Sequence, residues 1–169
     1  SGEMGTSANT DNAWHVVVLS CPSSLEYLVV SDGYANGGST ANLGGGLFVS
    51  GIGDLSMSHC VFRNNFAVES SSGGGSALWS TNSGKTFIDG CVFIDNSGGT
   101  CICPSPDFDI RNCIIETGSD QTLLSTSGLG SESSRFANCT IRRTATSVTK
   151  PLIQIYGVSG LYLYNCIID

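Results

Sequence analysis

The stretch Phe136-Ala-Asn-Cys-Thr-Ile-Arg-Arg143, FANCTIRR, is one of five related segments in this chain. The others are MSHCVFRN at 57–64, IDGCVFID at 88–95, IRNCIIE at 110–116 and YLYNCIID at 162–169. Their cysteines are Cys60, Cys91, Cys113, Cys139 and Cys166, separated by 31, 22, 26 and 27 residues. Repeats of this length predict a solenoid, in which each repeat forms one turn of a coil.

Apolar residues recur at fixed places around each cysteine: five and three residues before it, at the cysteine itself, and two residues after it. The first copy has Leu55, Met57, Cys60 and Phe62 at these places. Two copies carry a polar residue at the first place, Thr86 and Ser134. A sixth copy without cysteine lies upstream, with Leu25, Leu28 and Val30. The shared pattern indicates side chains that point into one common interior.

The spacing of these apolar residues also predicts a sharp bend in every repeat. Steps of two residues are typical of a β-strand, but the step of three before each cysteine breaks that alternation. The residue just before the cysteine must therefore turn the chain, and Asn and Gly enter the left-handed backbone region at least cost. The expected bend positions are Tyr27, His59, Gly90, Asn112, Asn138 and Asn165.

A further strand precedes each bend. Leu47, Leu78 and Ile153 each lie thirteen residues before a cysteine, and WHVVV, TCIC and QTLLS occupy the same slot in the other repeats. The sequence therefore predicts an all-β protein, a parallel β-helix of about six rungs with three short strands each. We expect residues 1–169 to be one β-helix domain, and either a fragment of a longer solenoid or a unit that stacks end to end.

The five repeated cysteines are expected to act as small buried apolar residues that form an inward column. Free thiols are favoured, because stacked parallel side chains rarely offer the torsion of a disulfide, although the rung spacing keeps a disulfide open. Cys21, Cys101 and Cys103 lie outside the column, where a disulfide and free thiols are equally open. No cysteine and histidine spacing is typical of a zinc site.

Composition excludes several classes of function. The net charge is −7, and no basic cluster is larger than Arg142-Arg143, which argues against nucleic-acid binding. No apolar run approaches the roughly 18 residues that span a bilayer. With 22 glycines and only 12% charged residues, the chain is expected to have a neutral polar surface rich in turns.

DNAWHVV at 11–17, GGGLFVSG at 44–51, CVFRNNFA at 60–67 and CVFIDNSG at 91–98 resemble segments of secreted right-handed parallel β-helix proteins of the pectin-lyase-like superfamily. GGGLF followed by FRNN is similar to the GGA[IL] and FxxN repeats of polymorphic outer-membrane proteins. The FxxN pattern occurs at Phe62–Asn65 and Phe93–Asn96 and fades in the C-terminal rungs. The resemblance implies a single-stranded right-handed coil and leaves activity open, because the superfamily contains lyases, hydrolases, adhesins and structural stalks.

Candidate binding residues are few. Phe48 and Trp79 occupy the same outward slot in successive rungs, where they would contact a glycan or a partner protein, unless a Gly-rich loop covers them. Asn138-Cys139-Thr140 is an acceptor sequence for N-glycosylation at Asn138.

Catalytic residues are not apparent. Asp54, Asp89, Asp107 and Asp109 are dispersed and pair with no basic residue in the sequence pattern, and Asp107 with Asp109 supplies too few oxygens for calcium. His15 and His59 accompany no nucleophile motif. We therefore expect a non-enzymatic, extracellular structural or adhesive module without a cofactor, which associates with itself, neighbouring β-helix segments, glycans or cell-surface proteins. The alternative is a carbohydrate-active or glycan-binding β-helix.

Overall fold

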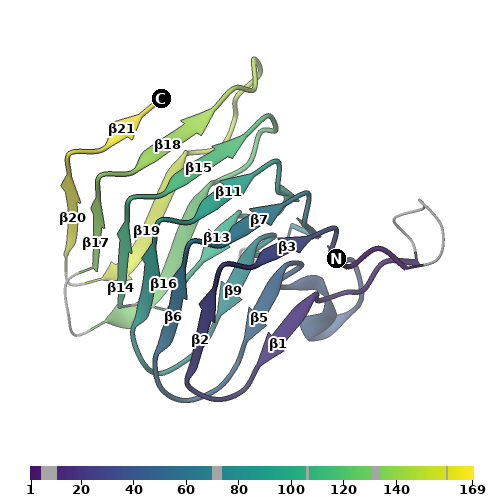
Figure 1. Cartoon of the computed structure of the whole chain (residues 1–169). Coiled ribbons are helices and arrows are strands. Elements are labelled where there is room, and N and C mark those ends of the chain that lie inside the picture. Colours follow the sequence, from purple (N-terminus) through teal and green to yellow (C-terminus); the bar gives the residue numbers. More distant parts are fainter. Residues whose placement is uncertain (5–10, 70–73, 106, 131–133, 159) are drawn as a thin grey trace.

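A computed structural model of the chain describes residues 1–4, 11–69, 74–105, 107–130, 134–158 and 160–169. In these ranges the chain forms a parallel β-helix whose strands pair only with their counterparts in neighbouring rungs (Figure 1). Colour runs from purple at one end of the stack to yellow at the other, so each rung lies next to its neighbours in sequence. The predicted all-β solenoid is confirmed.

Three sheets of six strands each form the walls of the coil. Sheet A contains Val17–Leu19 (β1), Leu47–Val49 (β5), Leu78–Ser80 (β9), Ile102–Cys103 (β13), Leu124–Gly130 (β16) and Ile153–Val158 (β19). Sheet B contains Ser23–Glu26 (β2), Leu55–Ser58 (β6), Thr86–Asp89 (β10), Phe108–Arg111 (β14), Ser134–Ala137 (β17) and Leu161–Tyr164 (β20). Sheet C contains Val29–Ser31 (β3), Val61–Arg63 (β7), Val92–Ile94 (β11), Ile114–Thr117 (β15), Thr140–Arg143 (β18) and Ile167–Ile168 (β21).

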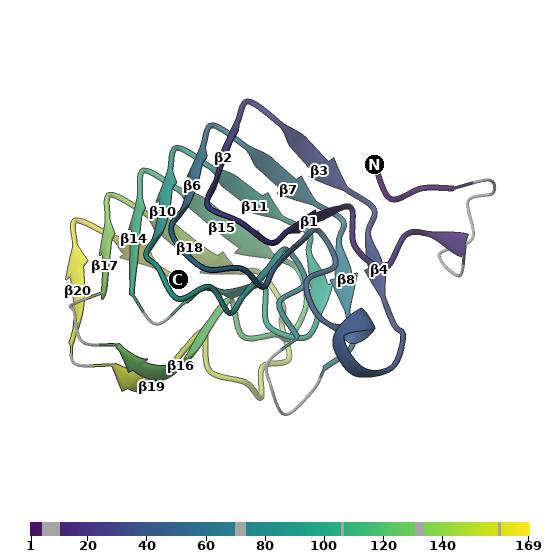
Figure 2. The same ribbon diagram turned by 90° about the horizontal axis from the view of Figure 1, so that it is seen from below.

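A fourth strand, which the repeat pattern did not predict, follows sheet C in the first three rungs. Tyr34–Ala35 (β4), Phe66–Ala67 (β8) and Ser97–Gly98 (β12) pair in parallel as sheet D. The helical turn η2 (Ser39–Asn42) lies in the loop that leaves the first of these strands, and Figure 2 shows it projecting at that corner of the coil. Two-residue strands carry too little alternation to be recognised from sequence.

The bend between sheets B and C has the left-handed backbone that the sequence pattern requires. Positive φ angles occur at Tyr27 (55°), His59 (53°), Gly90 (62°), Asn112 (53°), Asn138 (55°) and Asn165 (50°). The strands before and after this bend can therefore both turn their apolar side chains inward.

The interior consists of columns in which equivalent residues of successive rungs lie one above another. Val30, Phe62, Phe93, Ile115, Ile141 and Ile168 are register partners along sheet C. The rings of Phe62 and Phe93 stack with centroids 5.1 Å apart, and both side chains are fully buried. Ile168, in the final rung, is 47% exposed. Because each column continues through the coil, a cavity in one rung affects the packing of both neighbours.

Loss of one stacked ring should therefore destabilise the coil far more than loss of a ring outside it. Phe93→Ala should lower the free energy of unfolding by about 3–5 kcal/mol, because it leaves a cavity in the column. Phe87→Ala is the matched control, since Phe87 lies on the outer face of sheet B and is 39% exposed. Urea unfolding should show a loss of only about 1 kcal/mol for this control. Equal losses for the two variants would contradict the inward column.

Candidate functional site

A second bend, between sheets C and D, is built by the FxxN motif. The amide of Asn96 accepts hydrogen bonds from the backbone N–H (3.1 Å) and the Nδ2 group (3.0 Å) of Asn65. Nδ2 of Asn65 also donates to the carbonyl of Val30, and Oδ1 of Asn65 accepts from the N–H of Gly33. Both side chains are buried, so this inner asparagine pair fixes the second bend across three rungs.

The GGGL motif packs directly against this asparagine pair. A Cβ atom on Gly46 would lie 2.7 Å from the carbonyl oxygen of Ala77 and 3.1 Å from the amide of Asn65. A Cβ on Gly45 would lie 2.2 Å from the carbonyl oxygen of Phe66. Only glycine allows this approach. The two motifs that are separated in sequence thus form one structural unit.

The residues just before Asn65 and Asn96, and the equivalent residue of the first rung, also have the left-handed conformation and have side chains that reach the surface. Asp32, Asn64 and Asp95 have φ angles of 64°, 55° and 54° and form a polar column at the second bend. Tyr34 and Phe66 follow two residues later, and their rings stack with centroids 4.6 Å apart and an interplanar angle of 21°. Ser97 takes the equivalent place in the third rung.

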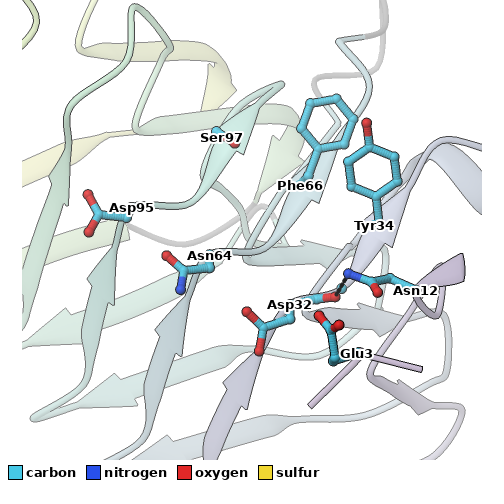
Figure 3. A pocket seen from close by; sticks show the side chains of 9 residues that line it. Glu3, Asn12, Asp32, Tyr34, Asn64, Phe66, Asp95 and Ser97 are labelled. Carbon is cyan, nitrogen blue, oxygen red and sulfur yellow. Dashed lines mark hydrogen bonds between the residues drawn. The ribbon is translucent and has the colours of Figure 1, made fainter. Parts of the chain in front are cut away.

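These side chains surround a pocket of about 280 Å³, which we call the bend pocket (Figure 3). Its lining residues are Glu3, Asn12, Asp32, Gly33, Tyr34, Asn64, Phe66, Asp95 and Ser97. Figure 3 shows the two rings together at one edge, Asp95 at the far end, and Glu3, Asn12 and Asp32 grouped below the rings. A concave site with an aromatic pair and several carboxylate and amide groups is typical of recognition of a small polar ligand.

Sequence reasoning did not find the bend pocket. Its residues come from three rungs and from the segments at 1–4 and 11–13, and each alone looks like an ordinary turn residue. The available signal was the recurrence of Asp or Asn at Asp32, Asn64 and Asp95, with an aromatic residue two places later in the first two rungs, at Tyr34 and Phe66.

A second group of polar side chains lies on the outer face of sheet B. Asp109 accepts hydrogen bonds from Nε (2.8 Å) and Nη2 (2.6 Å) of Arg111, and from Nη2 (2.6 Å) of Arg135. The Asp109 side chain is only 4% exposed, whereas the arginine side chains are 45% and 43% exposed. We call Asp109, Arg111 and Arg135 the arginine cluster. A pocket of about 210 Å³ lies beside it, and its lining residues are Phe87, Ile88, Asp89, Asp109 and Arg111.

The expectation that Asp54, Asp89, Asp107 and Asp109 pair with no basic residue is therefore wrong for Asp109. Asp109 bridges two arginines, and further ion pairs join Arg142 to Glu116, Arg143 to Asp120 and Lys150 to Glu69. Asp109 and Arg135 are register partners in adjacent strands, a contact that only the rung alignment brings about. In the ion pair between Arg111 and Asp109, the hydrogen bonds from Arg111 to the carboxylate raise the pKa of the Arg111 guanidinium.

The predicted bend residues of sheets B and C form a ladder on the surface. Nδ2 of Asn165 donates to Oδ1 of Asn138 (2.9 Å), Nδ2 of Asn138 donates to Oδ1 of Asn112 (3.2 Å), and Asn112 donates to the carboxylate of Asp89 (2.6 Å). His59 lies above Gly90 and stacks on Tyr27. A glycan at Asn138 would be attached to the same amide nitrogen that donates to Asn112.

The predicted contact pair Phe48 and Trp79 are register partners on sheet A, and both are half-buried. His15 stacks on Phe48 with centroids 5.0 Å apart. Gly44 and Gly75 approach the backbone of Phe48 and Trp79 so closely that a Cβ atom would lie 2.9 Å from each Cα. Gly44 and Gly75 thus pack against the backbone of this pair, and neither Phe48 nor Trp79 lines the bend pocket.

The cysteines of the repeat lie inside the coil. Cys60, Cys91, Cys113 and Cys139 are buried, and Cys166 in the last rung is partly exposed. All eight cysteines are free, including Cys21, Cys101 and Cys103. Burial raises the pKa of the Cys91 and Cys103 thiols to about 12. Such thiols hold little thiolate near neutral pH and are poor nucleophiles.

Thiol reactivity should follow this burial. In the folded protein near pH 8, a disulfide reagent such as Ellman's reagent should react rapidly with exposed Cys21 and more slowly with Cys166. Unfolding in urea without any reductant should release all eight thiols. A lower count in the unfolded, unreduced protein would show that a disulfide exists and would contradict the free column.

Within the described ranges, no three His, Cys, Asp or Glu side chains lie close enough to hold a metal ion between them. The helical turns in these ranges are also too short and too polar to cross a bilayer.

Comparison with known proteins gives the class of the chain. The family model described as "Right handed beta helix region" matches residues 30–168. The chain therefore belongs to the right-handed β-helix family, and its membership of the pectin-lyase-like superfamily is consistent with this match. No curated protein and no solved structure gives a significant match. The family contains enzymes and non-enzymatic proteins, so function must be inferred from the site.

Proposed function

We propose that this chain is a non-enzymatic, extracellular adhesive module in which the β-helix is a rigid scaffold and the bend pocket binds a saccharide. The observation that carries this proposal is the stacked pair Tyr34 and Phe66 beside Asp32, Asn64 and Asp95. An aromatic ring packs against the apolar face of a sugar, while carboxylate and amide groups satisfy its hydroxyl groups.

The arrangement of the pocket favours an oligosaccharide over a single sugar. Each of the first three rungs contributes one polar residue at the bend, and successive rungs are about 4.8 Å apart. This repeat is comparable to the length of one sugar ring. An oligosaccharide that runs along the helix axis would therefore meet a polar group at every ring.

The scaffold supports binding because it holds these groups in place before the ligand arrives. The inner asparagine pair and the close packing of Gly45 and Gly46 fix the second bend from behind. A site that is already ordered loses less conformational entropy on binding. Stiffness, which is also the property required of a stalk, here serves recognition.

An extracellular location and cell-surface partners are part of the same proposal. Only 12% of the residues are charged, and the net charge of −7 disfavours polyanionic partners such as nucleic acids. The buried column keeps most thiols away from oxidants, so free cysteines remain compatible with an oxidising compartment. Glycans are the partner class that the pocket fits best, and self-association or contact with neighbouring β-helix segments would add valency.

A carbohydrate-active enzyme is the second candidate, because the arginine cluster places two carboxylates and a guanidinium beside one pocket. Binding is favoured over catalysis there, since both oxygens of Asp109 already accept hydrogen bonds from arginine. A carboxylate held in this way is committed to its ion pairs and is not free to transfer a proton to a leaving group.

Glycan-array binding followed by calorimetry with the best ligand tests the proposal. Phe66→Ala, Asn64→Gly and Asp95→Asn should each weaken binding about tenfold or more, a loss of about 1.4 kcal/mol. Asn64→Gly keeps the left-handed backbone while it removes the amide. Thermal unfolding should show that each variant remains folded.

Two control variants locate the site. Phe87→Ala removes an exposed ring from sheet B, and the double variant of Phe48 and Trp79 to Ala removes the pair on sheet A. Neither should change binding. Loss of binding only in the double variant would move the site to sheet A, and release of sugar products that Asp109→Asn abolishes would favour the enzyme.

A further inference from the structure

The chain ahead of the first rung is fixed against the end of the bend pocket. The N–H of Gly2 donates to the carbonyl of Ser31 (2.7 Å), and the N–H of Ala13 donates to the carbonyl of Gly2 (2.8 Å). The N–H of Tyr34 in turn donates to the carbonyl of Ala13 (2.8 Å). Residues 1–4, residues 11–13 and the first rung therefore meet at one place.

A buried oxygen at this junction lacks any hydrogen-bond donor. Asn12 is 9% exposed, and its Nδ2 group donates to the carbonyl of Asp32 (3.0 Å). Its Oδ1 atom is buried and has no partner. A buried acceptor without a partner is unfavourable, so an unpaired oxygen in a pocket wall calls for a ligand that supplies positive charge or a proton.

Two carboxylates share this end of the pocket with Asn12. Glu3 and Asp32 both line it, and Figure 3 shows the carboxylate of Glu3 next to the side chain of Asn12, with the carboxylate of Asp32 on the other side of Glu3, toward Asn64. Oδ2 of Asp32 accepts a hydrogen bond from the hydroxyl group of Ser1 (3.0 Å). Aspartate and glutamate side chains are ionised at neutral pH, so the junction carries negative charge.

We propose that the end of the bend pocket binds a divalent cation of the calcium type through Oδ1 of Asn12 and the carboxylates of Asp32 and Glu3. Calcium prefers oxygen ligands from carboxylates, amides and water in a flexible arrangement, which suits two carboxylates and one amide with water in the remaining positions. The cation would join residues 1–4 and 11–13 to the first rung and so stabilise the start of the coil.

The small number of charged ligands sets the expected strength. Sites in extracellular modules bind calcium with dissociation constants of about 10⁻⁴ to 10⁻³ M, and a site with two carboxylates belongs in that range. Magnesium should bind more weakly, because it demands a near-octahedral arrangement and gives up its water reluctantly.

Calcium titration of the full chain without any saccharide, followed by calorimetry and thermal unfolding, tests this site directly. The wild type should bind one calcium ion per chain, and its unfolding temperature should rise with calcium concentration up to about 10 mM. Asn12→Ala and Asp32→Asn should each weaken binding about tenfold or more. Glu26→Gln, which removes an exposed carboxylate from the same rung, is the matched control and should bind like the wild type.

The variant Asn12→Asp tests whether Asn12 is a calcium ligand or has only a structural role. It adds a carboxylate of almost the same shape, so it should bind calcium about tenfold more tightly and should be less stable than the wild type when calcium is removed. Absence of any calcium-dependent heat or stabilisation in the wild type would overturn the proposal. So would calcium affinities in the Asn12 variants equal to that of the wild type. Because no saccharide is present, neither result depends on the proposed adhesive function.

Discussion

The left-handed bend between sheets B and C is the constraint on which the rest of the coil depends. One residue of positive φ lets two short strands meet at a corner while both direct apolar side chains inward. Repetition of this corner in each rung places equivalent residues above one another, which generates the stacked phenylalanines and the cysteine column. A different corner in one rung would turn its strands out of register with both neighbours.

The second bend shows how the same geometry creates a surface for recognition. Asp and Asn tolerate the left-handed region better than most residues, because their short polar side chains bond locally. Asp32, Asn64 and Asp95 satisfy the backbone requirement and also present ligand-binding groups to solvent. Behind them, Asn65 and Asn96 take the remaining backbone hydrogen bonds. The structure and the proposed function thus use the same residue types: the inward-facing asparagines hold the bend, and the outward-facing Asp and Asn residues line the pocket.

Much of the fold could be predicted because its signals are local and repeated. The break in alternation before Cys60, and its recurrence before Cys139, indicated the corner, and the slot at Leu47 indicated the third wall. The fourth strand at Phe66–Ala67 was missed, since two residues show no period. Repetition amplifies a weak pattern only where every rung carries it.

The sites were harder to predict because they depend on contacts between rungs. Arg135 lies 26 residues from Asp109, and nothing near either residue in sequence indicates their ion pair. The bend pocket likewise combines Glu3 with Asp95 across the first three rungs. Once the register is known, both groups can be found by aligning equivalent positions, as with Phe87, Asp109 and Arg135 on the outer face of sheet B.

The most direct test of the bend compares valine and glycine at Asn138, an exposed residue with a φ of 55°. Both substitutions remove the ladder amide, so the difference between their free energies of unfolding reports the backbone conformation. Asn138→Val should be less stable than Asn138→Gly by about 1 kcal/mol or more. At Thr140, two residues later in strand β18, the order should reverse, because valine favours a strand. Equal stability of the two Asn138 variants, or the same order at both positions, would contradict the account.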